Sequence, residues 1–168
     1  PNDKVIVDDA HKYLLEHYKE FDFIWSSPPC PTHSKITMMA SKSGSYDVRF
    51  PDMKLYEEII FLKHFFNRMW VVENVIGYYK PLIRPFISGR HYFWSNFIIS
   101  NIEGDNLTHN ERGTSKIGFD LSDKDLNHRK DQILRNCVDS RLGLHIFNCA
   151  FKEKQMTLHD SKEKRIEE

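Results

Sequence analysis

The chain has 168 residues, 40% of them hydrophobic and 13% aromatic, so it is long and apolar enough to fold around a core. Its 24 Lys and Arg residues balance 24 Asp and Glu residues. This balance argues against a protein that coats nucleic acid, but it allows an enzyme that binds DNA in a single cleft. The three cysteines and nine histidines lack disulfide or metal-ligand spacing, which predicts a reducing cytoplasm and no metal. The apolar runs are too short to span a membrane, and no signal peptide is visible.

The first third of the sequence predicts two strands with a helix between them. Lys4 to Val7 is predicted as a buried strand that ends in Asp8-Asp9, and Ala10 to Lys19 as a helix. Phe21 to Trp25 is predicted as a second strand, ended by a stiff loop because the prolines before Cys30 cannot continue a ladder. The small, polar stretch from Pro31 to Pro51 is predicted as a mobile, functional loop.

The rest of the chain continues the alternation. Asp52 is expected to cap a helix whose apolar positions are Leu55, Ile59, Leu62 and Phe66. The further expectations are, in order, a strand from Met69 to Val72 ending at Glu73-Asn74, a strand from Tyr92 to Ile99, an irregular stretch from Asn101 to Ser122, a helix from Ser122 to Asn136, a helix capped by Asp139 and carrying Leu142, Ile146 and Ala150, and a charged tail from Lys152. This order predicts an α/β fold with a mainly parallel sheet flanked by helices.

Three of the predicted strands are followed by acidic or thiol side chains that could take part in a reaction. Ligands of a parallel sheet bind beyond the carboxyl ends of its strands, which here carry Asp8-Asp9, Cys30 and Glu73. A cysteine on a stiff loop is an accessible nucleophile, and an acid on the neighbouring strand can give a proton to the group under attack. The alternatives are that Cys30 is a small buried hydrophobic residue and Glu73 a surface carboxylate.

The same residues resemble a known family. The segment from Phe21 to Cys30 resembles the Pro-Cys motif of the cytosine-5 DNA methyltransferases, and Val71 to Val75 matches their Glu-Asn-Val motif in the family's order and spacing. Looser similarities are the strand end from Val5 to His11, the segment from Gly89 to Trp94, and the ending from Leu134 to Ile146, which looks like small phage and prophage members. The resemblance covers residues 4 to 150 and implies a Rossmann-like fold that uses S-adenosylmethionine.

The resemblance also implies a mechanism and a set of site residues. Cys30 would add to carbon 6 of a cytosine flipped out of double-stranded DNA, Glu73 would hold the ring nitrogen, and Arg90 would hold the base carbonyl oxygen while carbon 5 is methylated. The implied cofactor residues are Asp8, Asp9, Ala10, Pro28 and Leu55, and the implied DNA or base contacts are Pro29, Ser34, Lys35, Asn74 and Val75. The loop from Pro31 to Pro51 would close over the DNA.

Two departures from the family pattern bear on these expectations. Phe86 and Ser88 stand where the family's Gln-x-Arg-x-Arg pattern has Gln and its first Arg, so Arg90 alone remains. The Gly-rich loop that cradles the methionine part of the cofactor is expected before residue 1, from a preceding segment or a second polypeptide. The implied organisation is a catalytic core over residues 1–100, a target-recognition region over 101–151 and a tail over 152–168, in a bacterial or phage restriction-modification protein of the cytoplasm.

Other functions remain open from the sequence. Amino-group DNA methyltransferases also carry a Pro-Pro pair at a strand end, and His33 near Cys30 allows a cysteine hydrolase. A truncated or degenerate chain would bind nucleic acid or a partner without catalysis, through basic residues such as Arg112 and Lys116. The remaining cysteines, Cys137 and Cys149, are predicted to lie in the core.

Overall fold

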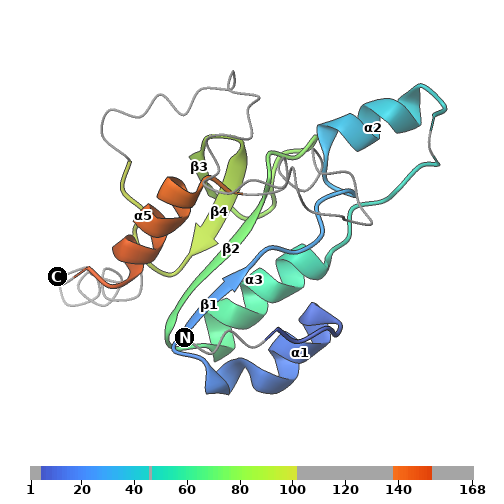
Figure 1. Cartoon of the computed structure of the whole chain (residues 1–168). Helices are drawn as coiled ribbons and strands as arrows, with labels where there is room; N and C mark the ends of the chain where they lie inside the picture. The colour runs from blue at the N-terminus through green and yellow to red at the C-terminus, as the bar shows by residue number, and fades with distance from the viewer. Residues whose placement is uncertain (1–4, 46, 102–137, 153–168) are drawn as a thin grey trace, which may run out of the picture. The chain divides into compact units, whose positions relative to one another are not determined.

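The structure of the chain is a computed structural model that describes residues 5–45, 47–101 and 138–152 (Figure 1). Its elements are α1 (Ala10–His17), a 3-10 turn (Tyr18–Glu20), β1 (Phe23–Ser26), α2 (Lys35–Lys42), α3 (Lys54–Phe65), β2 (Met69–Val75), β3 (Phe86–Ser88), β4 (His91–Ser95) and α5 (Ser140–Ala150). The chain divides into two compact units, residues 1–87 with 92–96 and residues 88–91 with 97–168. Each unit is described by itself.

The strands form one four-stranded sheet in the order β1-β2-β4-β3. β1 and β2 are parallel, with Phe23 opposite Met69 and Ser26 opposite Val72 (Figure 1). The expected α/β fold with flanking helices is therefore confirmed, but the sheet is mixed and not mainly parallel, with one parallel pair. The reason lies in β3 and β4, which are joined by two residues, Gly89 and Arg90, with Gly89 at a φ of 56°. So short a connection makes a hairpin, whereas parallel neighbours need a long crossover.

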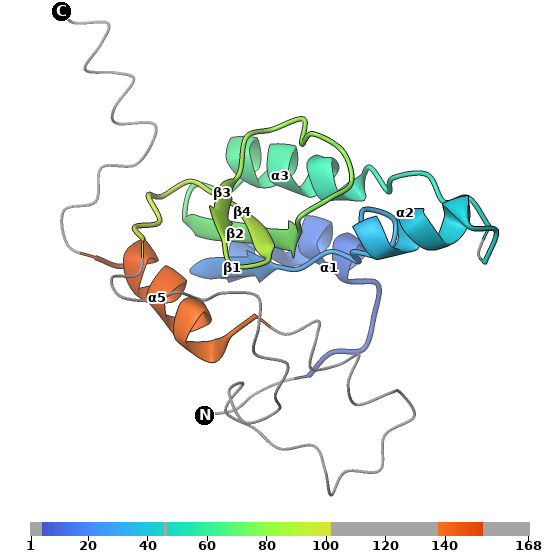
Figure 2. The ribbon, with the colours of Figure 1, turned by 90° about the horizontal axis from the view of Figure 1, so that it is seen from above.

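The core of the first unit lies between α1, α3 and one face of the sheet. Figure 2 shows α3 lying along that face. The core cluster combines Leu14 of α1, four residues of α3 and buried side chains of three strands, namely Ile24, Trp70, Val72 and Trp94. The apolar repeat of α3 predicted from the sequence is thus the face that it buries, including Leu55, Ile59 and Leu62.

The opposite face of the sheet carries a different set of side chains. Successive side chains of a strand alternate between the two faces. Because Trp70 and Val72 face the core cluster, Val71 and Glu73 point to the other side of β2. Trp25 is in register with Val71, and its ring meets Phe93 edge to face at 6.2 Å between centroids. This second face is also buried, since Val71 and Phe93 are almost fully covered.

Of the two helix caps predicted within the described residues, Asp139 is confirmed and Asp52 is displaced by one residue. The Asp139 carboxylate accepts a hydrogen bond from the Arg141 N–H at 2.8 Å and begins α5, whose buried residues include Leu142, Ile146 and Ala150, as expected. Cys149 is buried on the same helix, which confirms its predicted core position. At α3 the N-cap is Met53, one residue after the predicted Asp52, although the Asp52 carboxylate still accepts from the Lys54 N–H at 3.1 Å.

Two expectations for the amino-terminal part were wrong. Val5–Val7 form no strand, and Val5 and Val7 are 85% and 97% exposed. A β-branched run becomes a strand only beside another backbone, and within the described residues these three pair with none. The stretch from Pro31 to Pro51 is not loop throughout, because it contains α2, which Ser34 caps by accepting from the Ile36 N–H at 3.2 Å.

The strand predicted from Tyr92 to Ile99 also ends early, and β3 was not foreseen. β4 stops at Ser95 because the next side chain takes over the hydrogen bonds that a longer strand would make. Asn96 accepts from the Trp70 N–H at 3.0 Å and donates to the Arg68 carbonyl at 2.9 Å. The predictions for residues 102–137 and 153–168, including the helix up to Asn136 and the fate of Cys137, lie outside the described residues. No helix in the described ranges is long and apolar enough to cross a membrane.

Candidate active site

The carboxyl ends of β1 and β2 bring the two sequence motifs together. Ser26 is in register with Val72, so the chain from Ser27 to Cys30 leaves β1 beside the residues from Glu73 onward in β2. The Asn74 side-chain amide donates to the Pro28 carbonyl at 3.0 Å and fastens one motif to the other. The convergence predicted from strand order is therefore present for Cys30 and Glu73.

Glu73 is a buried acid with an altered proton affinity. Its side chain lies on the second face of the sheet and is 6% exposed. Burial raises the pKa of the Glu73 carboxyl to about 7, and a hydrogen bond from the Ser27 hydroxyl acts in the opposite direction. Because this value lies near neutral pH, the carboxyl can both give and take a proton there.

Cys30 is a half-buried thiol held in a tight turn. Its carbonyl accepts from the backbone N–H groups of His33 at 3.0 Å and Ser34 at 3.1 Å. Burial raises the pKa of the Cys30 thiol, and the negative charge of Glu73 raises it further. The resting cysteine is thus protonated at neutral pH, and it lies close enough to Glu73 for the two groups to influence each other.

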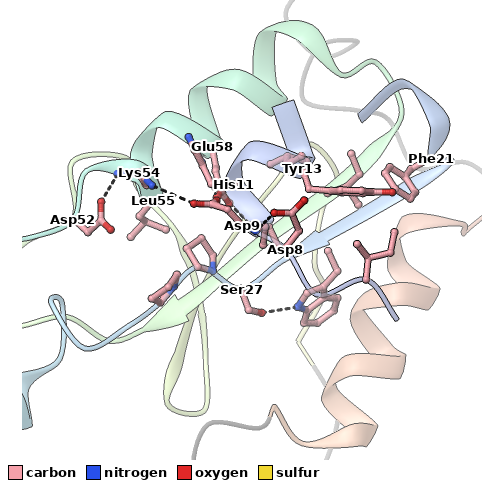
Figure 3. Close-up of a pocket in the computed structure, with 18 of the residues that line it drawn as sticks. Asp8, Asp9, His11, Tyr13, Phe21, Ser27, Asp52, Lys54, Leu55 and Glu58 are labelled. Atoms are coloured by element: carbon pink, nitrogen blue, oxygen red, sulfur yellow. Dashed lines mark hydrogen bonds and ion pairs between the residues drawn. The ribbon is translucent and has the colours of Figure 1, made fainter. Parts of the chain in front are cut away.

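A cavity of about 610 Å³ lies beside β1 and is lined by residues of α1, β1, the loop after β1, and α3 (Figure 3). All five residues predicted to bind a cofactor line it, namely Asp8, Asp9, Ala10, Pro28 and Leu55. Pro29, predicted to contact the base, lines it as well. Asp9 caps α1 by accepting from the Lys12 N–H at 3.0 Å, and this hydrogen bond lowers the pKa of its carboxyl.

The cavity wall contains a polar group that the sequence analysis did not identify. The buried Glu58 carboxylate accepts from the Ser26 hydroxyl at 2.5 Å and bonds His11 Nδ1 at 3.0 Å, and Figure 3 shows Glu58 and His11 side by side. These bonds join α1, β1 and α3. A signal for Glu58 existed, because an acid at this position falls on the apolar face of a helix with Leu55 and Leu62.

His33, like Glu58, is a buried polar residue in the cavity wall. It is 2% exposed, lines the cavity, and bonds the Tyr79 hydroxyl through Nδ1 at 2.7 Å. Burial lowers the pKa of His33, so the ring is neutral at neutral pH. Its Nε2 has no hydrogen-bond partner among the described residues. Neither ring nitrogen of His33 is hydrogen-bonded to the Cys30 thiol, so the structure shows no Cys-His pair like that of a cysteine hydrolase.

The remaining predicted site residues have less specific positions. Ser34 uses its hydroxyl to cap α2, Lys35 is exposed in the first turn of that helix, and Val75 is half-buried at the end of β2. Arg90 is exposed in the turn between β3 and β4, and it belongs to the second compact unit. Across the ranges that the structure describes, no group of three or more His, Cys, Asp or Glu side chains is placed to hold a metal ion.

Comparison with models of protein families, with curated proteins and with solved structures found no match to this chain.

Proposed function

We propose that this chain is the catalytic part of a DNA (cytosine-5-)-methyltransferase, with Cys30 as the nucleophile and Glu73 as its acid. One observation carries the proposal. The parallel pairing of β1 and β2 brings a thiol and a buried carboxyl of raised pKa together, and the loop residues Ser27 to Pro29 that precede the thiol line a large cavity. The fold would then be part of a Rossmann-like methyltransferase fold.

The two groups suit the first chemical step. Attack on carbon 6 of cytosine requires a thiolate at sulfur and a proton for the ring nitrogen at position 3. If Cys30 and Glu73 together hold one proton, its passage from sulfur to the carboxyl gives both reactive forms at once. The sulfur then forms a bond to carbon 6 while the Glu73 proton goes to the ring nitrogen, so charge and protons balance. The Glu73 pKa of about 7 is closer to the pKa of a thiol than the pKa of an ordinary carboxyl is. This smaller difference lowers the free-energy cost of moving the proton from the Cys30 sulfur to Glu73.

The cavity fits a cofactor of the expected kind. Its volume falls within the range of about 300–1,000 Å³ that small-molecule sites occupy. Leu55 and Pro28 would pack against the adenine, and Asp8 and Asp9 would accept hydrogen bonds from amino or hydroxyl groups. S-adenosylmethionine, when bound, supplies an electrophilic methyl group to carbon 5 of the base. A Gly-rich segment for its methionine part would come from a preceding segment or a second polypeptide.

The target would be double-stranded DNA from which one cytosine is flipped out, at a cost of a few kcal/mol. Arg90 would hold the base carbonyl oxygen. Pro29, Asn74 and Val75 would surround the base, and Ser34 and Lys35 at the start of α2 would contact the DNA strand.

Trapping of a covalent adduct tests the proposal. The protein is incubated with S-adenosylmethionine and duplex DNA that contains 5-fluorocytosine, whose fluorine blocks release of the enzyme after methylation. Mass spectrometry should find the DNA attached to Cys30. Cys30→Ser should abolish the adduct, and Cys149→Ser, which changes a buried cysteine of α5, should retain it.

The same assay is repeated with a longer polypeptide, or a second one, that supplies a Gly-rich segment. An adduct that forms only there would locate the rest of the cofactor site in the added polypeptide. Folded protein that gives no adduct in either form would contradict the proposal and leave binding without catalysis.

A further inference from the structure

We infer that Ser27 is a positioning residue for Glu73, and that the Trp25 indole aims the Ser27 hydroxyl at the Glu73 carboxyl. The inference rests on the proposed function and deepens it, because it identifies what holds the proposed acid in place. Both Ser27 and Trp25 lie in the segment that carries the Pro-Cys resemblance, but neither was given a role in the site predicted from the sequence.

The backbone places Ser27 beside Glu73. Trp25 is in register with Val71 and Ser26 with Val72, so the next residues along the two parallel chains are Ser27 and Glu73. Side chains in register on parallel strands project to the same face of a sheet. Ser27 therefore shares a face with Trp25 and Glu73, whereas Ser26 projects to the other face, where it bonds Glu58 of α3.

The hydrogen bonds fix the direction of the Ser27 hydroxyl. The Trp25 indole nitrogen lies 3.1 Å from Ser27 Oγ, and Figure 3 marks this bond by a dashed line at Ser27. An indole N–H can only donate, so the Ser27 oxygen accepts from Trp25 and keeps its own proton for another acceptor. The Glu73 carboxyl, to which Ser27 is hydrogen-bonded, is that acceptor.

This arrangement affects both the orientation and the charge of Glu73. A hydroxyl that donates to a carboxylate stabilises the charged form and restrains its rotation. Burial acts the other way on Glu73, and the charge of the Glu73 carboxylate in turn raises the pKa of the Cys30 thiol. Ser27 thereby keeps the proton affinity of Glu73 low enough for the carboxyl to release a proton near neutral pH.

Direct titration of Glu73 tests the inference without requiring activity. The protein is labelled with glutamate carrying ¹³C at the side-chain carboxyl, and the Glu73 signal is assigned from its absence in Glu73→Gln. In Ser27→Ala the midpoint should move to higher pH by about half a unit or more, a threefold or larger change in the acid dissociation constant. Ser27→Thr, which keeps a hydroxyl, should stay near the original midpoint, and Trp25→Phe should shift it upward by less than Ser27→Ala.

Ser26→Ala is the matched control, because this neighbouring hydroxyl lies on the other face, and it should leave the Glu73 midpoint unchanged. An unchanged midpoint in Ser27→Ala overturns the inference. An equal shift in Ser27→Thr overturns it as well, since the hydroxyl would then not be the cause. A variant counts only if its spectrum shows the folded protein; if Ser27→Ala unfolds, Trp25→Phe supplies the test, and an unchanged midpoint there overturns the inference.

A second measurement separates this inference from the proposed function. The pH profile of adduct formation should rise with the loss of a proton from Glu73, so its acidic limb should move to higher pH in Ser27→Ala and not in Ser27→Thr. If titrations differ as expected but no variant forms an adduct, the methyltransferase proposal fails and the Ser27–Glu73 contact stands. If adducts form and neither measurement responds to Ser27, the proposed function stands and the inference fails.

Discussion

Burial raises the pKa of both the Glu73 carboxyl and the Cys30 thiol, and the charge of Glu73 raises the pKa of Cys30 further. Part of the raised pKa of Cys30 comes from burial, which a substitution at Glu73 leaves largely in place. The remainder comes from the negative charge of Glu73, which a substitution removes. The reactivity of the thiol therefore reports the presence of that charge.

Replacing Glu73 by Gln should lower the pKa of Cys30 and make the thiol react faster. The thiolate is the reactive form, so at pH 8 the rate of alkylation by iodoacetamide should rise by about two- to fivefold, allowing for the lower nucleophilicity of a less basic thiolate. Mass spectrometry of Cys30 in a background without Cys137 and Cys149 measures this rate. An unchanged or slower rate would show that the two groups do not interact.

At the scale of elements, single side chains hold helix ends and loops in place. Asp139→Ala removes the cap of α5 and should lower the free energy of unfolding by about 1 kcal/mol, as urea titration would measure. Asp139→Asn should cost little, because an asparagine oxygen accepts the same hydrogen bond. A loss of equal size in both variants would mean that the carboxylate acts by its charge and not as a cap.

Asn74 joins β2 to the loop that carries Cys30, and this bond needs an N–H donor. Asn74→Asp supplies only acceptors, so its carboxylate would face the Pro28 carbonyl without a hydrogen bond. We expect the free energy of unfolding to fall by about 1–3 kcal/mol at neutral pH. Recovery at low pH, where the aspartic acid regains a proton to donate, would identify the lost donor as the cause; a loss that is equal at all pH values would argue against it.

Elements whose pattern reflects their own packing were predictable from the sequence, and elements that depend on distant partners were not. The apolar spacing of four, three and four in α3 and the Asp139 cap are local signals, and both were confirmed. α2 was missed because it has only eight residues in a small, polar stretch and buries none of them, so that its apolar Ile36 and Met39, three residues apart, are exposed. The end of β4 depends on Asn96 bonding Arg68 and Trp70, which no local pattern contains.

The candidate site shows the same division. Strand order was enough to predict that Cys30 and Glu73 lie together. The part played by Ser27 depends on the register between β1 and β2, and that of Glu58 on the packing of α3 against β1. Neither contact can be derived from the residue types along a single strand or helix.

For the whole molecule, two buried groups make the stability depend on pH in opposite directions. The Glu73 pKa of about 7 lies above its unfolded value of 4.5, so the folded chain binds this proton more tightly, and the stability it contributes is lost as the pH rises through 7. Burial, together with the charge of Arg90, lowers the His91 pKa from 6.5 to about 4. Stability from His91 is therefore present above pH 6.5 and lost as the pH falls through 4.

The Glu73 contribution can be isolated by comparing the protein with Glu73→Gln. The free energy of unfolding of the original protein, relative to that of Glu73→Gln, should fall by about 3 kcal/mol as the pH rises from 4 to 8. Urea titrations at a series of pH values measure it, and the His91 contribution cancels because both proteins contain it. A difference that stays constant with pH would mean that Glu73 keeps an ordinary pKa in the folded protein.

The bond between Trp25 and Ser27 has an optical consequence. The chain has three tryptophans, of which Trp70 and Trp94 are enclosed in the core cluster, whereas Trp25 lines the cavity with its indole hydrogen-bonded to Ser27. Light emitted by an indole changes in colour and intensity when its polar surroundings change. A molecule that enters the cavity should thus alter the emission of Trp25 and leave that of the other two unaffected, which gives the protein a built-in fluorescent reporter of occupancy that Trp25→Phe would silence.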